Sequence, residues 1–230
     1  MVDIDRNKSQ SPVYRKKGMA TQEAYERIKH LIAVNQLVPG QKLIYGDIAK
    51  KLKIGITPVI QSLNRLETLG LVRYEANKGY SVGEITEAEI RQLYQAREAL
   101  EIFVIPDVIK NIDSKKLDEI AENFKGKNCE KRSRREMILE DIRFHLAIVQ
   151  HARNDIIYRL LESILEQVYL KYRPEYLDNM RVKVTTKEHR ELLRCLKRKD
   201  VDKATTRIRD HIRSGMEYVV GTIQLERPGF

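Results

Sequence analysis

The segment from Val38 to Gly83 limits the folds open to this chain more than any other part of it. Its longest helical pattern starts at Thr57-Pro58, where the threonine hydroxyl can accept orphaned backbone N–H groups and proline suits the first helical position. Apolar residues then recur at helical spacing and predict one buried face: Val59, Leu63, Leu66 and Leu69. Gly70 follows, at a position where a left-handed residue commonly ends a helix.

A shorter amphipathic pattern precedes this helix and a hairpin pattern follows it. The shorter pattern consists of Leu43, Ile48, Ala49 and Leu52. The turn between the two patterns is Lys53-Ile54-Gly55. Two strand-forming runs, Leu71–Tyr74 and Tyr80–Val82, flank a tip at 75–79. This order is typical of proteins that place one helix in the DNA major groove and a β-hairpin wing beside it. A helical hairpin and a β-hairpin without any ligand are the alternative interpretation.

The same segment resembles the winged-helix domain of GntR-type bacterial transcription regulators. The resemblance is carried by PGxxL at Pro39–Leu43, DIAxxL at Asp47–Leu52, TPVxxxLxRLExLGLV at Thr57–Val72, and Lys78-Gly79-Tyr80 in the wing. It implies that the second helix and the wing contact DNA through these residues: Thr57, Ile60, Gln61, Asn64, Arg65, Lys78, Gly79 and Tyr80.

This chain departs from the family pattern at three positions. Members of the family commonly carry arginine where this chain has Gly46, Ile56 and Ile60. Major-groove arginines read guanine through two hydrogen bonds. We therefore expect an operator richer in A·T pairs, in which Gln61 and Asn64 read adenine edges and Ile60 contacts a thymine methyl group.

The distribution of charge matches the position of this segment. Residues 1–83 carry 14 basic and 7 acidic side chains, whereas the remaining 147 residues carry 29 and 26. A basic N-terminal third suits a polyanionic partner. We predict a disordered basic arm at 1–17, a winged helix-turn-helix domain at 18–83 and a helical domain at 84–230.

The cysteines and the hydropathy indicate a cytoplasmic protein. Cys129 and Cys195 are far apart and have no partner cysteines at metal-ligand spacing, which fits a reducing compartment. No apolar run approaches the roughly 20 residues needed to span a bilayer. The polar N-terminus has no signal-peptide core, so we expect no membrane partner.

The pattern after the wing changes to long helices without alternating strands. Three pairs have capping-box spacing: Thr86 with Glu89, Ser133 with Glu136, and Thr185 with Glu188. Pro106 is expected to kink or split the first long helix, Pro174 falls in another helical segment, and Lys125–Lys131 is expected to form a loop. The whole chain is therefore predicted to be mostly α, with three helices and a hairpin wing followed by an all-α antiparallel bundle.

Three inward histidines and one aspartate stand out in this bundle. Asp141 and His145 are four residues apart on one helix face, while His189 and His211 lie on apolar faces of two later helices. Neutral imidazoles with one carboxylate suit Zn²⁺, Ni²⁺ or Mn²⁺. A single inward histidine is more often a hydrogen-bonded core residue, and spacing does not show that three helices converge. From the residues alone, both interpretations remain open.

A second resemblance bears on this choice. DIRFH at Asp141–His145, HARN at His151–Asn154, KEHRELLRCLKRKD at Lys187–Asp200 and RDHIRSG at Arg209–Gly215 resemble the FCD effector domain of GntR-type regulators. The resemblance implies a divalent transition metal held by Asp141, His145, His189 and His211. It also implies open coordination positions for water or a small carboxylate, with Arg97 and Asn154 facing the effector. His30 and His151 are expected to be ordinary surface or core histidines.

Together these features predict a non-enzymatic transcription regulator, most simply a repressor. The resemblance implies a homodimer on a palindromic double-stranded operator, with binding controlled by a small carboxylate or sugar acid. One alternative is a metal-dependent hydrolase, because an open metal site can activate water. However, no separate acid/base constellation accompanies the histidines. The other alternative is an architectural DNA-binding protein whose helical part only dimerises.

Overall fold

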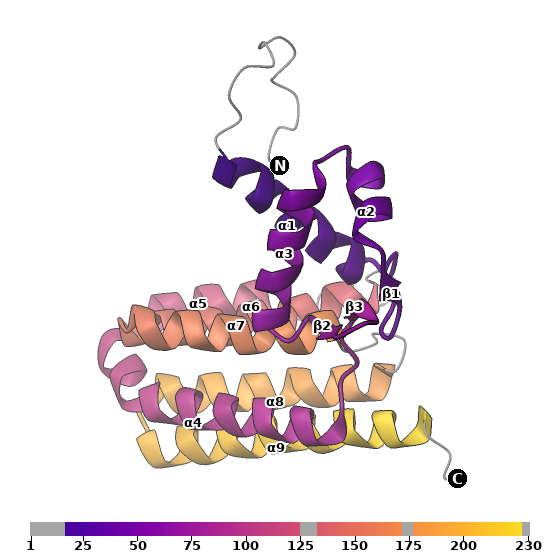
Figure 1. Cartoon of the computed structure of the whole chain (residues 1–230). Coiled ribbons are helices and arrows are strands. Elements are labelled where there is room, and N and C mark those ends of the chain that lie inside the picture. The colour runs from indigo at the N-terminus through magenta and orange to yellow at the C-terminus, as the bar shows by residue number, and fades with distance from the viewer. Residues whose placement is uncertain (1–16, 125–132, 172–176, 227–230) are drawn as a thin grey trace. The chain divides into compact units, whose positions relative to one another are not determined.

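The computed structural model describes residues 17–124, 133–171 and 177–226, which confirm a mostly helical fold (Figure 1). The chain divides into two compact units, Met1–Gly83 and Glu84–Phe230. Apart from Lys17, the predicted arm lies outside the described residues, as do the predicted loop and Pro174. Among the described helices, none combines the length and apolar character needed to cross a membrane.

The N-terminal unit is a winged helix-turn-helix. Its described elements are α1 (Lys17–Ala33), β1 (Lys42–Leu43), α2 (Tyr45–Leu52), α3 (Ile56–Thr68), β2 (Val72–Glu75) and β3 (Gly79–Val82) (Figure 1). The strands form an antiparallel sheet in the order β1-β3-β2, with Val72 opposite Val82 and Glu75 opposite Gly79. The predicted order of helix, turn, helix and hairpin is confirmed.

The face of α3 that packs on the core has the predicted spacing. Val59, Leu63 and Leu66 are each 0% exposed. Ser62 is also buried, and its Oγ lies 2.8 Å from Thr21 O in α1 and 2.7 Å from Pro58 O, so the hydroxyl can donate to either carbonyl. Gly70 has φ +65°, as expected of a left-handed residue after the helix.

Two local expectations in this unit are wrong. Helix α3 begins at Ile56 after Gly55, so Thr57 is not its N-cap and makes no capping bond. No side-chain cap is present at its start, and Val59 near that end is fully buried. Leu43 does not belong to the shorter helix but to β1, where it pairs with Tyr80 and fills the core beneath the sheet.

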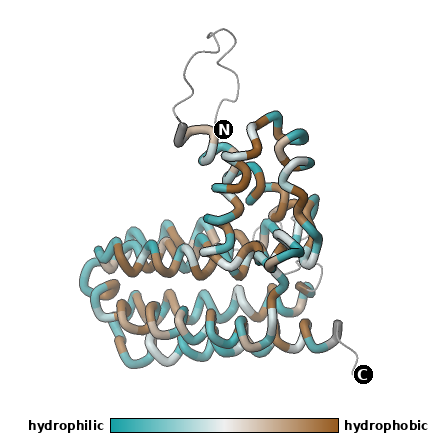
Figure 2. Tube along the Cα trace, viewed as in Figure 1, coloured by the Kyte–Doolittle hydropathy of each residue, from teal (hydrophilic) through white to brown (hydrophobic). Residues whose placement is uncertain are grey.

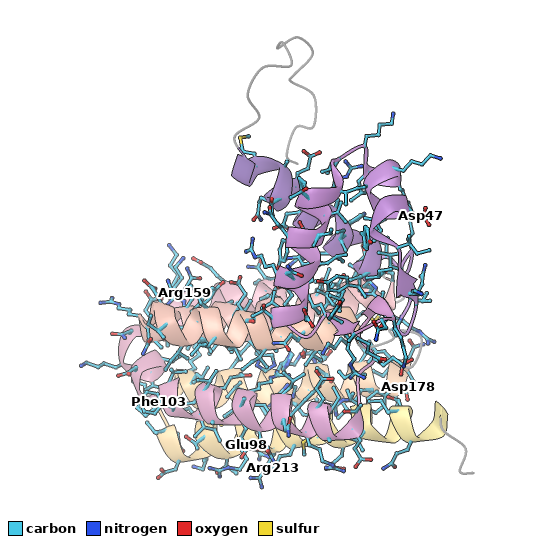
Figure 3. The ribbon with its side chains drawn as sticks, in the orientation of Figure 1. Asp47, Glu98, Phe103, Arg159, Asp178 and Arg213 are labelled. Carbon is cyan, nitrogen blue, oxygen red and sulfur yellow. The ribbon has the colours of Figure 1, made fainter. Side chains whose placement is uncertain are left out.

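The C-terminal unit is an all-α bundle. Its described elements are α4 (Glu87–Asn111), α5 (Ser114–Asn123), α6 (Arg134–Val149), the 3₁₀ turn η2 (Gln150–Ala152), α7 (Asp155–Lys171), α8 (Asn179–Lys197) and α9 (Val201–Glu226). Helices α5, α6 and α7 lie in one layer, and α4, α8 and α9 lie in the other (Figure 1). Hydrophobic and hydrophilic stretches alternate along each helix, as an amphipathic bundle requires (Figure 2). Outside the core, Arg213 of α9 donates two 2.8 Å hydrogen bonds to Glu98 of α4 (Figure 3).

The predicted helix starts in the bundle are only partly correct. Ser133 and Glu136 form the reciprocal capping box of α6, and Thr86 caps α4 by accepting from Glu89 N. Thr185 is wrong as a cap, because α8 already begins at Asn179 with Asp178 as its N-cap. Pro106 does not split α4, which continues to Asn111. Apolar residues on both sides of the proline are buried and hold the helix together: Val104, Ile105, Val108 and Ile109.

The backbone packs closely around Gly83, which directly follows strand β3 of the wing, so this position should not tolerate a side chain. A Cβ at Gly83 would lie 2.7 Å from Gly70 O, whereas a Cβ at Gly46 in α2 would meet nothing within 4 Å. We expect Gly83→Ala to destabilise the N-terminal unit by about 1–3 kcal/mol, because backbone must shift to admit the methyl group. Gly46→Ala is the matched control and should leave stability unchanged or raise it. Calorimetric melting of both variants measures their stability. A Gly83→Ala variant as stable as the unmodified protein would contradict the described packing.

Candidate metal centre and nucleic-acid interface

Three helices bring the four predicted ligands together. Helix α6 supplies Asp141 and His145, α8 supplies His189 and α9 supplies His211. One ligand atom from each side chain lies within 4.8 Å of all the others. This His/Asp cluster (Asp141, His145, His189 and His211) was predicted from spacing and resemblance, but only the fold shows that the three helices converge.

The histidines of the cluster are removed from solvent while the aspartate is partly open. His145, His189 and His211 are 0%, 8% and 4% exposed, whereas the Asp141 side chain is 27% exposed. Phe144 stacks on the His189 ring with centroids 3.8 Å apart. The cluster is therefore closed on the histidine side and accessible on the aspartate side.

Two further carboxylates orient the histidine rings. His145 Nδ1 lies 2.6 Å from Glu101 Oε2, and His211 Nδ1 lies 2.8 Å from Glu188 Oε2. Burial raises the pKa of Glu101, but His145 and Arg97 outweigh it and lower that pKa to about 2. Burial alone would raise the pKa of Glu188, but the bond and charge of His211 together with Arg181 and Ser214 lower it. An ionised carboxylate can only accept, so each Nδ1 must carry a proton.

This orientation directs unprotonated nitrogens at one another. With protons on both Nδ1 atoms, the Nε2 atoms of His145 and His211 face each other at 3.0 Å. Two neutral rings in this state would oppose their lone pairs, so the pair needs a cation between them. A shared proton would serve this pair alone. The third ring has its Nε2 buried 3.2 Å from Asp141 Oδ1, without a well-aligned hydrogen bond among the described residues. A metal cation would engage all three rings.

The protonation of the remaining groups suits a metal. Burial lowers the pKa of His189 to about 3 and also lowers the pKa of His211. Burial alone would raise the pKa of Asp141, but the nearby His189, His145 and Arg97 hold that pKa well below its usual range. Neutral imidazoles and an ionised carboxylate are the forms that bind metal.

A cavity opens beside the cluster. Its space, mouth included, measures about 1040 Å³, and its lining contains Asp141, His189 and His211. Arg97 also lines it, with Nε bound to Glu101 Oε1 at 2.6 Å and Nη2 3.9 Å from Asp141 Oδ2. Among the described residues, Arg97 Nη2 is a buried donor without a hydrogen-bond partner. The predicted location of Arg97 beside a cavity thus agrees with the structure.

Asn154 is placed elsewhere. It does not line the cavity, and its Oδ1 accepts from Ile157 N at the start of α7. Its polar side chain is used as a helix cap, which corrects the expectation that it faces the effector.

The sequence interpretation missed Glu101, Glu188 and Arg181. Arg181 lines the cavity and donates to Ser214 Oγ at 2.7 Å. A signal for Glu101 was available, because it falls four residues after Arg97 on the apolar stripe of α4, where a charge must be paired. Glu188 and Arg181 had no comparable signal in the sequence, although the fold leaves their side chains only 23% and 10% exposed.

Most of the predicted DNA-contacting residues are exposed on the N-terminal unit. Along α3 the side chains of Thr57, Gln61, Asn64 and Arg65 are exposed, and Ile60 is half buried. In the wing, Lys78 is exposed and Gly79 has φ +83°, a conformation that favours glycine.

Several of these side chains already have partners within the unit. Thr21 donates to Gln61 Oε1 at 2.8 Å, and Arg65 donates to Gln22 Oε1 at 2.6 Å. Tyr80 donates to Asn64 Oδ1 and is itself only 8% exposed. Tyr80 is therefore a support for Asn64 rather than a surface contact, which corrects its predicted role. The amide oxygens of Gln61 and Asn64 accept these bonds, so their amide N–H groups are the donors that each side chain still offers.

A winged helix-turn-helix joined to an all-α unit with a buried His/Asp cluster is the architecture of a bacterial transcription regulator. The family model for bacterial regulatory proteins of the gntR family matches residues 20–82, and the FCD domain model matches residues 92–214. The chain thus belongs to the gntR family of regulators that carry an FCD domain.

Individual relatives agree with this assignment. The chain is 25% identical to the HTH-type transcriptional regulator McbR of Escherichia coli over 75% of this chain and 80% of McbR. It is 22% identical to the uncharacterised HTH-type regulator YdhC of Bacillus subtilis over 85% of this chain and 88% of YdhC. The solved McbR structure has a TM-score of 0.70 at 19% identity and covers 89% of this chain and 98% of McbR. The metal-free FCD domain of TM0439 has a TM-score of 0.52 at 24% identity, covering 62% of this chain and 99% of that domain.

The orienting role of Glu188 can be measured. We expect Glu188→Gln to weaken Zn²⁺ binding by about 10–100-fold, because the neutral amide no longer requires the proton of His211 to stay on Nδ1. Glu191→Gln is the matched control, since Glu191 lies on the same helix and pairs with Arg207 instead. Competition against a chromophoric chelator gives both affinities. Equal affinities for the two variants would exclude an orienting role.

Proposed function

We propose that this chain is a metal- and effector-responsive repressor. Its winged unit binds a palindromic operator as part of a homodimer, and a small carboxylate bound at the His/Asp cluster controls that binding. The observation that carries the proposal is the facing pair of Nε2 atoms, 3.0 Å apart, beside His189 Nε2, which lies 3.2 Å from Asp141 Oδ1 and has no well-aligned hydrogen bond among the described residues.

The donor set supports a divalent transition metal. FCD domains can bind metal, and in this chain Asp141, His145, His189 and His211 would hold it. Three imidazoles and one carboxylate suit Zn²⁺, Ni²⁺ or Mn²⁺. When bound, the cation supplies a positive charge that anionic oxygens can ligate directly. Glu101 and Glu188 keep the histidine nitrogens aimed at it.

The cavity beside the cluster supports a carboxylate as effector. Arg97 Nη2 is buried and lacks a hydrogen bond among the described residues, so it is ready to donate to an anion. Tyr94 also lines the cavity, and burial raises its pKa, so its hydroxyl stays protonated and can donate. These two donors lie on α4, and the metal ligands lie on the other helices around the cavity.

The exposed face of α3 and the wing support operator recognition. Members of the gntR family bind DNA operators, and the N-terminal third of this chain is the basic part. Gln61 and Asn64 would offer amide N–H groups to base edges in the major groove, and Lys78 would contact phosphate. Arg65 is held over the Tyr25 ring at 4.1 Å and would reach the backbone from there.

Regulation requires that the effector distinguish two states of the protein. A carboxylate that bound the DNA-competent and DNA-incompetent states equally would change nothing. Because α4, α6, α8 and α9 all contribute to the cavity or the cluster, an acid bound there can change their packing. Altered packing would in turn change the spacing or mobility of the two winged units of a dimer.

Loss of one ligand tests the metal centre. We expect His189→Ala to lose bound Zn²⁺, because it removes an imidazole from the centre of the cluster. His151→Ala is the matched control, since His151 lies in η2 outside the cluster. Elemental analysis of purified protein reports the outcome. Undiminished zinc in His189→Ala would eliminate this ligand set.

Salt dependence tests the wing. Lys78→Gln should weaken binding to a duplex selected from random sequence, and the slope of log affinity against log salt should fall by about 1. Lys110→Gln in α4 is the control and should leave the slope unchanged. If Lys78→Gln keeps the slope of the unmodified protein, Lys78 does not contact phosphate.

A further inference from the structure

The lining of the cavity beside the His/Asp cluster combines polar and apolar side chains. It includes part of the cluster, Arg97 and an apolar wall contributed by α6, α7 and α8. This wall consists of Met137, Ile138, Ile142, Leu165, Val168 and Val182. A ligand that fills the cavity must therefore combine an anionic group with an apolar body.

The cationic side chains of the cavity lie close to the His/Asp cluster. Among its described lining residues they are Arg97 and Arg181. Arg97 Nη2 lies 3.9 Å from Asp141 Oδ2 and has no hydrogen bond among the described residues. Arg181 donates to Glu188 Oε2 at 3.4 Å, and the same oxygen lies 2.8 Å from His211 Nδ1. The side chains of the apolar wall are uncharged, so a second carboxylate placed against the wall would have no cationic partner there.

Two of the hydroxyl groups in the lining already have partners. Thr186 Oγ1 donates to Val182 O at 2.8 Å within its own helix, and the Tyr218 hydroxyl accepts from Asp178 N at 3.0 Å. The side chains of the apolar wall carry no hydrogen-bonding group, so the hydroxyl groups of a sugar acid that lie against the wall would lose their hydrogen bonds to water.

We propose that the effector is a monocarboxylic acid with an apolar aliphatic or aromatic body. Its carboxylate lies at the cluster beside Arg97, and its body lies against the apolar wall. The inference rests on the proposed function, because it assumes that a carboxylate binds at the cluster. It narrows the effector class by excluding sugar acids and polycarboxylates.

Six-carbon acids of matched length provide the test. Hexanoate has the proposed chemistry, gluconate adds hydroxyl groups, adipate adds a second carboxylate, and hexanamide removes the charge. Calorimetric titration of the zinc-loaded full chain should show hexanoate binding at least about tenfold more tightly than gluconate or adipate. Hexanamide should bind more weakly still. Gluconate or adipate binding as tightly as hexanoate would overturn the inference.

A pair of isosteric variants locates the apolar body. Met137→Gln should weaken hexanoate binding at least about fivefold while zinc content stays unchanged. Met216→Gln is the matched control, because Met216 is similarly half buried but lines a different groove. Equal hexanoate binding by both variants would overturn the placement of the body against Met137.

The same preparations separate this inference from the proposed function. Zinc content and binding to the selected duplex are measured alongside each titration. If zinc content and duplex binding are normal but gluconate or adipate binds more tightly than hexanoate, the effector class is wrong and the proposed function stands. A zinc-loaded chain that binds none of the acids overturns the effector class and the carboxylate control of DNA binding together.

Discussion

The C-terminal unit is organised around a pair of imidazole nitrogens that cannot face each other without a cation between them. Glu101 and Glu188 fix the Nδ1 protons of His145 and His211, so the Nε2 atoms that face each other at 3.0 Å are both unprotonated in the neutral rings. An apolar core would avoid such an arrangement, because unpaired buried polar atoms destabilise the fold. The bundle keeps it at the meeting point of α4, α6, α8 and α9, so the cluster joins helices distant in sequence.

The same constraint shapes the ligand cavity. Arg97 is held by Glu101, the residue that also orients His145, so one buried carboxylate places both the proposed anion donor and a proposed metal ligand. Mutation of Glu101 would therefore disturb both at once. The N-terminal unit uses its polar groups in a similar way, since Tyr80 and Thr21 hold the amides of Asn64 and Gln61 on the exposed face of α3.

Much of this organisation is predictable from the residues. Helical periodicity located α3 and the bundle, and resemblance selected Asp141, His145, His189 and His211 before any fold was known. The wrong predictions concerned the ends of helices or residues whose contacts form only across the fold. The start of α8 was missed because the Thr185–Glu188 spacing also occurs within a helix. Tyr80 was assigned to the surface because its ring becomes buried only when the sheet forms. Glu188 was missed because nothing in its own helix shows that His211 of α9 lies 2.8 Å away.

X-ray absorption at the zinc edge of the zinc-loaded full chain tests the central claim most directly. The account predicts a first shell of nitrogen and oxygen atoms at about 2.0–2.2 Å, with the outer-shell scattering of three imidazole rings and no sulfur. Sulfur at about 2.3 Å would assign the metal to a cysteine instead. A shell of oxygen without imidazole scattering would show that the cluster holds no metal.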